Sequence, residues 1–187
     1  MKTVIIVNGI PASGKSTTAK LISEELNFPY LSIDTIKEPF MEIHSDIDRE
    51  LNRELGKAAY KVIWNTICSS PDNCIYVVDA WFGFQPKELL LEYLNSSNID
   101  NVIEVWNEIS PALVVERYKQ RLPFRKEGHP GPEYLPELEK LAKQAKPMNV
   151  GKTFCIKQDC LNGFSELIKN ISSIIHTTTP QKAISKF

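Results

Sequence analysis

The chain has 187 residues, the length of one domain with room for an inserted flap if a domain takes about 150 residues. Its 42% hydrophobic and 24% charged residues are ordinary for a globular protein and argue against a disordered or fibrous chain. The 22 basic and 23 acidic residues give a net charge of −1 and a pI near 6.3. This balance lacks the basic excess of a general nucleic-acid binder, although a local basic groove stays compatible with it.

Neither a membrane span nor secretion is predicted. No run approaches the roughly 20 apolar residues that a span needs. The first apolar run, 4–7, is too short for the core of a signal peptide and leads into Asn8-Gly9, not into a small-residue cleavage site. The four cysteines stand at Cys68, Cys74, Cys155 and Cys160. They form no close Cys-x-x-Cys pair of the kind that binds zinc, so we expect reduced, mostly structural thiols in a cytoplasmic protein.

Short apolar runs alternate with helical patterns along the chain. We predict strands at about 4–7, 30–33, 74–78, 102–106 and 153–156, where the residues are apolar and often β-branched. We predict helices at about 15–26, 46–68, 86–95, 111–122, 136–145 and 164–175, where apolar residues recur every three or four positions or where proline and a capping residue mark a start. Between 123 and 136 the composition changes to glycine, proline and charge, which predicts a mobile segment outside the core.

This alternation predicts βαβ units and an α/β fold with a five-stranded parallel sheet covered by helices on both faces. We place a single domain at 1–176 and a loose C-terminal tail at 177–187, where no apolar period remains. Ligands of such sheets bind beyond the carboxyl ends of the strands. The residues at the predicted strand ends should therefore converge; they are Gly9, Asp34, Asp79 and Trp106-Asn107.

The segment 9–16 carries the strongest functional signal. It reads Gly-Ile-Pro-Ala-Ser-Gly-Lys-Ser and matches the phosphate-loop pattern G-x-x-x-x-G-K-[ST] at every position. It also follows a predicted buried strand and precedes a predicted helix, as the motif requires. In such a loop successive backbone N–H groups point inward at phosphate oxygens, and the N-terminus of the next helix adds positive potential. The sequence therefore predicts a site for ATP.

Within this loop the side chains have separate expected roles. Lys15 should reach the β- and γ-phosphates, and the hydroxyl of Ser16 should bind Mg²⁺. The residues expected to bind the nucleotide are Gly9, Pro11, Ala12, Ser13, Gly14, Lys15, Ser16 and Thr17. No base-reading Asn-Lys-x-Asp segment exists, which argues against a GTPase, and the chain is too short for a large motor ATPase. A small kinase remains.

Two segments carry a resemblance to a known group of kinases. The loop 9–17, followed by Leu-Ser-Ile-Asp-Thr-Ile-Lys-Glu at 31–38, resembles the phosphate-loop kinases grouped with chloramphenicol phosphotransferase, zeta toxins and polynucleotide kinase. Closest in pattern are the members known as "predicted kinases", with an AAA-type ATP-binding domain. The resemblance covers most of the chain. It implies a three-layer, nucleoside-kinase-like P-loop fold with a small helical lid at about 111–146, and it implies ATP-dependent phosphorylation of a hydroxyl group.

Asp34 is the residue that we expect to activate the acceptor. Its counterpart in the resembling kinases contacts the acceptor hydroxyl, and a carboxylate there orients that hydroxyl and takes its proton during transfer. The alternative is that Asp34 caps the helix that follows. Lys37 comes one helical turn later and either faces the same cleft or is solvated.

Asp79 follows the third apolar run and is expected to hold Mg²⁺ or to touch substrate, capping or turn formation being the alternative. Trp81, Phe82 and Phe84 follow it and either wall a substrate pocket or belong to the core. The segment 79–83 lacks the Asp-Gly-Phe-Pro-Arg pattern of adenylate kinases, which argues against a nucleoside monophosphate as acceptor. The triple-glycine stretch of shikimate kinase is also missing.

Three arginines at four-residue spacing form a further candidate group, Arg117, Arg121 and Arg125. Arg117 and Arg121 are expected to share a helix face, and a solvated face is the alternative. They resemble lid arginines that fold over ATP and neutralise charge on the transferred group, a task that suits a planar guanidinium.

The neighbouring Gly-His-Pro-Gly at 128–131 resembles a lid segment in which His129 would lie near substrate. Several of those lids have a second histidine where this chain has Pro132. By the same resemblance, the adenine base would lie between Arg117 and the loop at Gln158 and Asp159.

The sequence thus predicts an ATP:hydroxyl phosphotransferase with ATP and Mg²⁺, acting on a small molecule such as a sugar, antibiotic or nucleoside. One alternative is a polynucleotide 5′-hydroxyl kinase, which would need a basic, aromatic-lined channel. Another is a nucleotide-binding regulator or toxin-like protein that turns over no metabolite, and slow ATP hydrolysis is a third. The acceptor and the oligomeric state stay open.

Overall fold

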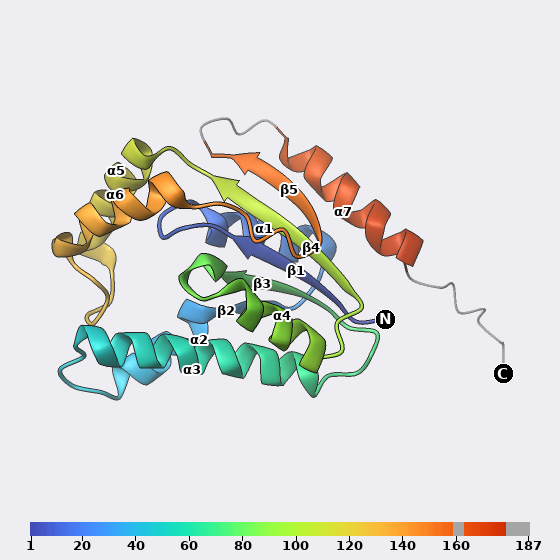
Figure 1. The fold of residues 1–187 in the computed structure, drawn as a ribbon, viewed down its shortest axis with the longest axis horizontal. Coiled ribbons are helices and arrows are strands. Elements are labelled where there is room, and N and C mark those ends of the chain that lie inside the picture. Colours follow the sequence, from blue (N-terminus) through green and yellow to red (C-terminus); the bar gives the residue numbers. More distant parts are fainter. Residues whose placement is uncertain (159–162, 179–187) are drawn as a thin grey trace.

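A computed structural model describes residues 1–158 and 163–178. A parallel five-stranded sheet in the order β2-β3-β1-β4-β5 lies between helices (Figure 1). The strands are β1 (Thr3–Asn8), β2 (Tyr30–Ser32), β3 (Ile75–Ala80), β4 (Asn101–Glu108) and β5 (Lys152–Lys157). The helices are α1 (Lys15–Leu26), α2 (Ile33–Glu42), α3 (Arg49–Cys68), α4 (Lys87–Ser96), α5 (Pro111–Arg121), α6 (Leu135–Gln144) and α7 (Phe164–Thr178), with short 3₁₀ turns η1 (Phe82–Phe84), η2 (Leu122–Phe124) and η3 (Pro132–Tyr134).

The predicted five-stranded parallel α/β fold is confirmed, and the differences lie at element ends. β2 stops at Ser32, so Asp34 lies in the first turn of α2 and does not end a strand. β3 continues to Ala80, so Asp79 lies inside the strand. The helix expected after Asp34, for which no bounds were predicted, is α2, and it continues through Pro39.

The C-terminal prediction needs one correction. Helix α7 continues to Thr178, so 177 and 178, the first two positions of the predicted loose tail, are helical. The rest of that predicted tail, 179–187, lies outside the described residues, as do Asp159 and Cys160. Among the helices that the structure describes, none combines the length and apolar character needed to cross a bilayer.

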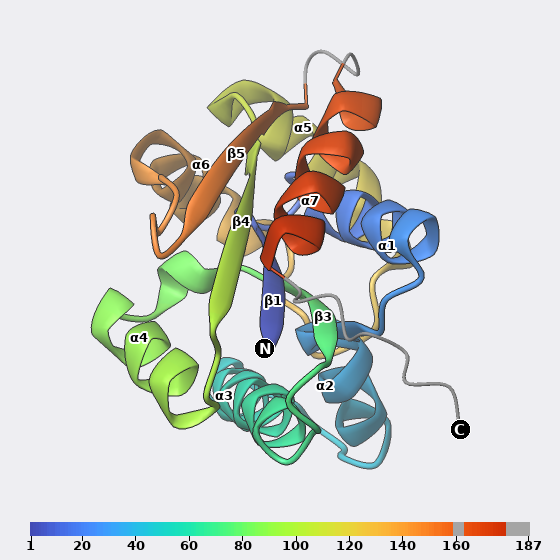
Figure 2. The same ribbon diagram turned by 90° about the vertical axis from the view of Figure 1, so that its right-hand side faces the viewer.

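Two apolar layers cover the sheet because side chains alternate between its faces. Ile5 and Val7 of β1 pack with α1 and α7, whereas Val4 and Ile6 pack with α3 and α4. Figure 2 shows α1 and α7 together on one side of the sheet and α3 and α4 on the other. All four β1 side chains are fully buried, so the phosphate loop that follows β1 starts from a rigid base.

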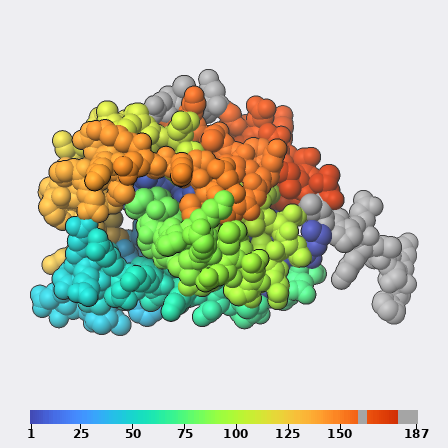
Figure 3. Space-filling model, in the orientation of Figure 1, coloured from blue at the N-terminus to red at the C-terminus, as the bar shows by residue number. Residues whose placement is uncertain are grey.

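Helices α5 and α6 lie together beyond the carboxyl ends of the strands (Figure 1). A third apolar cluster joins them to the phosphate loop, with Ile10 and Ala12 of the loop against Val114, Tyr118 and Leu138 of the two helices. The molecular surface is hollowed between α6 and the N-terminal part of α3 (Figure 3). The segment predicted as a lid therefore lies over the carboxyl ends of the strands, the end of the sheet at which the site was predicted.

Candidate active site

The phosphate loop curls tightly after β1. Gly14 has φ +84° and Ala12 has φ +65°, both in the left-handed region. A Cβ atom at Gly9 would collide with the Ser13 side chain, and one at Gly14 would collide with the Gln158 side chain, so close approach requires glycine at both positions. The loop thus has the compact, inward-turned backbone that a phosphate group requires.

The same loop contains polar groups without protein partners. The hydroxyl of Ser13 is buried and accepts or donates no hydrogen bond to a described residue. Helix α1 begins directly at Lys15, and no side chain caps its first N–H groups. Buried polar atoms and uncapped helix N-termini are normally satisfied, and an anion satisfies both kinds. The loop therefore fits the phosphate-binding role predicted from its sequence.

A cavity of about 560 Å³ opens beside this loop. It lies between the phosphate loop, the first turn of α2, the N-terminal half of α3, the end of β3 and the lid helices. Most of the predicted site residues line it: Pro11, Ala12, Lys15, Ser16, Asp34, Lys37, Asp79, Trp81, Arg121, Arg125 and His129. Of the residues expected to converge at the strand ends, Asp34 and Asp79 line this cavity, whereas Gly9, Trp106 and Asn107 do not.

Five predicted site residues are not among those that line the cavity: Gly9, Ser13, Gly14, Thr17 and Arg117. Thr17 is exposed on α1 and is not among the lining residues. Arg117 does not share the position of Arg121, because its Nη2 donates a hydrogen bond to the carbonyl of Gln158 at 3.3 Å. The two arginines are on consecutive turns of α5, but only Arg121 reaches the cavity. Arg117 instead ties α5 to the end of β5, where the resemblance placed the adenine base.

Asp34 faces a group of positive charges. Its side chain is 50% exposed because it borders the cavity, and the Nζ of the buried Lys37 is 3.9 Å from its Oδ1. Burial alone would raise the pKa of Asp34, but the charges of Lys15, Lys37 and Arg125 outweigh it and hold the pKa below its ordinary value. The carboxylate is therefore ionised at neutral pH.

The capping alternative for Asp34 is wrong. The N-cap of α2 is Ser32, and no side chain makes a capping hydrogen bond there. In the first turn the carboxylate of Asp34 still interacts favourably with the helix dipole. Burial lowers the pKa of Lys37, the negative charge of Asp34 opposing it. Lys37 is thus a buried counter-charge to Asp34 and not the solvated lysine of the alternative interpretation.

Asp79 is held by two hydroxyl groups and is 2% exposed. Tyr30 Oη donates to Asp79 Oδ2 at 2.8 Å, and Ser32 Oγ lies 3.4 Å from the same oxygen. The other oxygen, Oδ1, is buried and has no partner among the described residues. Burial and the adjacent charge of Asp79 raise the pKa of Tyr30, which keeps the phenol protonated as a donor. One carboxylate oxygen is therefore fixed and the other is available.

This donor set fits a magnesium ion. Asp79 and Ser16 both line this cavity, and their side chains carry oxygen atoms, the ligands that Mg²⁺ prefers. No group of three or more His, Cys, Asp or Glu residues within 1–158 and 163–178 is arranged to hold a metal. A magnesium ion here would therefore rely on phosphate oxygens and water for its remaining ligands, as is usual for this ion.

The aromatic run after β3 divides between cavity and core. Trp81 and Phe84 line the cavity with ring centroids 6.3 Å apart. Phe82 is 1% exposed and packs edge-on against Tyr60 in the core. Gln85 also lines the cavity, and its Oε1 is buried without a described partner. Phe82 thus belongs to the core, and Trp81 and Phe84 lie at the cavity.

His129 joins the lid to α2. Arg125 Nη2 lies 2.8 Å from His129 Nδ1, and His129 Nε2 lies 3.4 Å from Glu38 Oε1. Burial, together with the charges of Lys37 and Arg125, lowers the pKa of His129 to about 4. The imidazole is therefore neutral at pH 7, with Nδ1 accepting from Arg125 and Nε2–H donating to Glu38. Arg125 is further held over the ring of Tyr118 at 4.9 Å.

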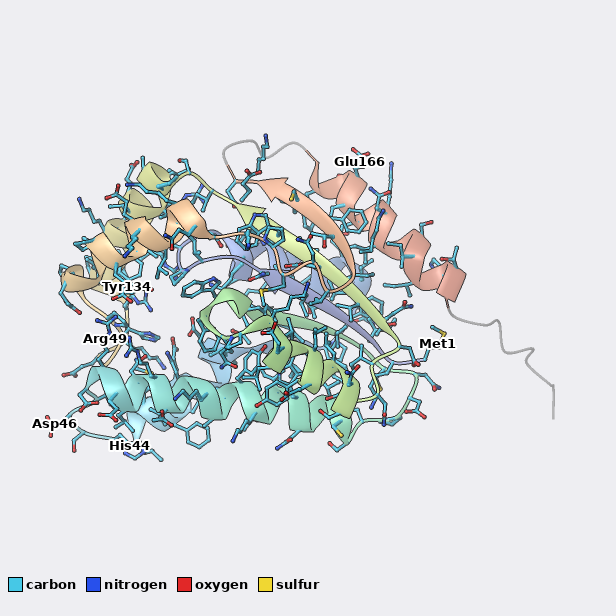
Figure 4. All side chains as sticks on the ribbon, in the orientation of Figure 1. Met1, His44, Asp46, Arg49, Tyr134 and Glu166 are labelled. Carbon is cyan, nitrogen blue, oxygen red and sulfur yellow. The ribbon has the colours of Figure 1, made fainter. Side chains whose placement is uncertain are left out.

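Sequence reasoning missed the polar face of α3 and one buried carboxylate. Arg49 and Arg53 line the cavity, and their four-residue spacing was the available signal. Figure 4 shows Arg49 on α3 close to Tyr134 of the lid. Glu104 is fully buried in β4 and accepts hydrogen bonds from the Asn8 side chain and from the backbone of Met148. A charge inside an apolar strand was the signal for Glu104, which anchors the segment that returns from the lid.

Comparisons with known proteins find the same fold in solved structures. No protein-family model matches the chain, and no curated protein matches its sequence. Solved structures match its fold. A candidate kinase from Chloroflexus aurantiacus superposes with TM-score 0.80 at 20% identity, over 95% of this chain and 98% of that one. Shikimate kinase from Acinetobacter baumannii in complex with shikimate superposes with TM-score 0.54 at 18% identity, over 96% of this chain and 95% of that one.

A gluconokinase from Sinorhizobium meliloti gives a TM-score of 0.55 at 14% identity, over 92% of this chain and 97% of that chain. With the phosphate loop and cavity described above, these matches define the class: the chain has the α/β fold of phosphate-loop small-molecule kinases. The narrower resemblance to chloramphenicol phosphotransferase and zeta toxins stays a prediction.

Proposed function

We propose that this protein is an ATP-dependent kinase that transfers the γ-phosphoryl group to a hydroxyl group of a small molecule. The observation that carries the proposal is that the phosphate loop and an ionised carboxylate, Asp34, line one cavity. The matches to shikimate kinase and gluconokinase support the same class of reaction by fold. Cavities of this size accommodate small molecules.

The phosphate side of the reaction falls to the loop and the lid. Backbone N–H groups of the loop and the N-terminus of α1 would bind phosphate oxygens, with Lys15 at the β- and γ-phosphates. Arg121 and Arg125 would bind the transferred group from the lid side. Ser16 and Asp79 would hold Mg²⁺, which supplies charge neutralisation between the phosphates when it is bound.

The acceptor side falls to α2 and the loop after β3. Asp34 would orient the acceptor hydroxyl and accept its proton as the oxygen forms a bond to the γ-phosphorus and the bridging bond to ADP breaks. Lys37 holds the Asp34 carboxylate in the charged form that this step needs. Trp81 would form a wall for the body of the acceptor. His129 has both ring nitrogens engaged with protein, which favours positioning of Arg125 over contact with substrate.

The proposal is tested by screening hydroxylated metabolites and antibiotics for acceptor-stimulated release of ADP. The wild-type protein should show a stimulated rate with at least one acceptor and yield a phosphorylated product by mass spectrometry. The Asp34→Asn variant should lose that rate, and Asp46→Asn, which changes an exposed aspartate outside the cavity, should keep it.

The other outcomes separate the alternative functions. Phosphorylated oligonucleotide ends, formed with steep salt dependence, would replace the acceptor class by a polynucleotide. ATP binding without any phosphorylated product, together with a stable protein partner, would indicate a regulator. ADP release that no acceptor stimulates would mean simple hydrolysis and would contradict the kinase proposal.

A further inference from the structure

One face of α3 presents cations to the cavity. Arg49, Arg53 and Lys57 follow one another at four-residue spacing, and all three line the cavity. Residues four apart lie on the same face of a helix, separated by about 6 Å along its axis. Helix α3, which carries this row, lies apart from α1 in the fold (Figure 1).

The three cations differ in their partners. Arg49 forms an ion pair with Glu137 of the lid, and Lys57 Nζ lies 2.7 Å from Glu54 Oε1 on its own helix. Arg53 forms no ion pair or hydrogen bond with any residue that the structure describes, and it is exposed. The positive charge in the middle of the row is therefore the one that the protein itself does not neutralise.

Gly56, one turn after Arg53, has no packing reason to be glycine. It lies inside the 20-residue helix α3, where glycine costs stability relative to alanine. A Cβ atom built on Gly56 would meet nothing within 4 Å, and Gly56 also lines the cavity. Neighbouring protein atoms therefore leave room for a larger residue here, and the unfilled space opens toward the cavity.

Other cations near the cavity already have a proposed ligand or a partner within the protein. Lys15, Arg121 and Arg125 lie where the phosphates of the nucleotide would bind, and Lys37 is paired with Asp34. Arg53 is left as an unmatched charge on the acceptor side. An Arg side chain offers several donors in one plane and binds carboxylate or phosphate oxygens through two of them.

Resting on the proposed kinase function, we propose that the acceptor carries an anionic group beside its reacting hydroxyl and that Arg53 binds this group. The body of the acceptor would lie over Gly56 and against Trp81 and Phe84, which line the same cavity. The buried, unpartnered Oε1 of Gln85 would accept a hydrogen bond from a further hydroxyl of the same molecule. The acceptor class is therefore a hydroxylated carboxylic acid or a hydroxylated phosphate ester.

The test compares acceptors in matched sets of three, each a sugar acid, the corresponding neutral sugar and the corresponding sugar phosphate. Wild-type protein should prefer one anionic member by at least about tenfold in kcat/KM, the gain expected of one charged hydrogen-bonded pair. Arg53→Gln should remove that preference by raising KM while leaving the KM for ATP unchanged. Lys61→Gln, an exposed cation on α3 outside the cavity lining, should change neither value.

Gly56→Ala gives a second readout that a misfolded variant would not reproduce. It should raise the melting temperature, because alanine favours the helix, and at the same time raise the KM of the acceptor. Asn65→Ala, at an exposed position of the same helix, should raise the melting temperature without affecting KM. A Gly56→Ala variant with unchanged KM would overturn the proposed location of the acceptor.

Calorimetric binding of the anionic compounds without nucleotide separates this inference from the kinase function. Binding that Arg53→Gln abolishes, with no phosphorylated product from any compound, would support the anion site and overturn the kinase proposal. Equal phosphorylation of neutral and anionic members, unaffected by Arg53→Gln, would keep the kinase and overturn the anion site. Neither binding nor product would overturn both.

Discussion

His129 should make the stability of the folded protein depend on pH, and His129→Gln should remove that dependence. The imidazole accepts a hydrogen bond from Arg125 of the lid and faces Glu38 of α2. The other charged groups acting on it are Lys37 and Asp34, also from α2. Protonation of Nδ1 would remove the acceptor that Arg125 uses and would place two positive groups in contact.

The size of the effect follows from the pKa of His129. The folded protein lowers this pKa from 6.5 to about 4, so folding favours the neutral form of the imidazole. The contribution of the neutral imidazole to the stability of the folded protein is complete above pH 6.5 and is lost as the pH falls toward 4. At about pH 5 an exposed imidazole is protonated while the buried one is still neutral. This difference in protonation lowers the free energy of unfolding by roughly 2 kcal/mol, which is about a 30-fold change in the folding equilibrium constant.

The assay is urea unfolding of wild type and His129→Gln between about pH 8 and about pH 5. The free energy of unfolding of wild type should fall by roughly 2 kcal/mol more than that of His129→Gln over this range. His44→Gln, at an exposed position (Figure 4), is the matched control and should follow the wild type. Parallel curves for wild type and His129→Gln would refute the proposed burial of a neutral histidine between lid and α2.

Three further changes test separate parts of the structure. Asp34→Asn should keep nucleotide affinity but lower the transfer rate by roughly 10²–10⁴-fold, measured by single-turnover kinetics, and a wild-type rate would remove Asp34 from the reaction. Tyr30→Phe should leave Asp79 less firmly held and weaken Mn²⁺ binding to the nucleotide complex several-fold by electron paramagnetic resonance, whereas an unchanged affinity would mean that this hydroxyl positions nothing. Gly151→Ala should lower the free energy of unfolding by roughly 2 kcal/mol or more in urea, because the added Cβ would collide with the backbone carbonyl of Val102, and wild-type stability would show that β4 and the segment before β5 are not packed so closely.

The parts of the site that are local in sequence were predictable from it. The phosphate loop is one continuous segment between a strand and a helix, and its glycines, Lys15 and Ser16 lie where the motif implied. The sheet was equally accessible, because apolar β-branched runs such as 4–7 and 102–106 are buried on both faces. Such features depend on neighbouring residues alone.

The remaining features depend on contacts between distant segments. The four-residue spacing of Arg117 and Arg121 predicted a shared helix face. The carbonyl of Gln158, which accepts a hydrogen bond from Arg117, is 41 residues away in the sequence. The contact between His129 and Glu38 spans 91 residues, and no local pattern encodes it. Which face of α3 meets the cavity depends likewise on where the lid settles. Long-range packing of this kind decides the chemistry around a site more than it decides the fold.

Calorimetric titration with a non-hydrolysable ATP analogue and Mg²⁺ tests the central claim most directly. The wild-type protein should bind the analogue at a single site, and Lys15→Ala should abolish or greatly weaken that binding. Lys20→Ala, at an exposed position of the same helix, should bind like wild type. Unchanged affinity in Lys15→Ala, or no binding by the wild type, would contradict the account.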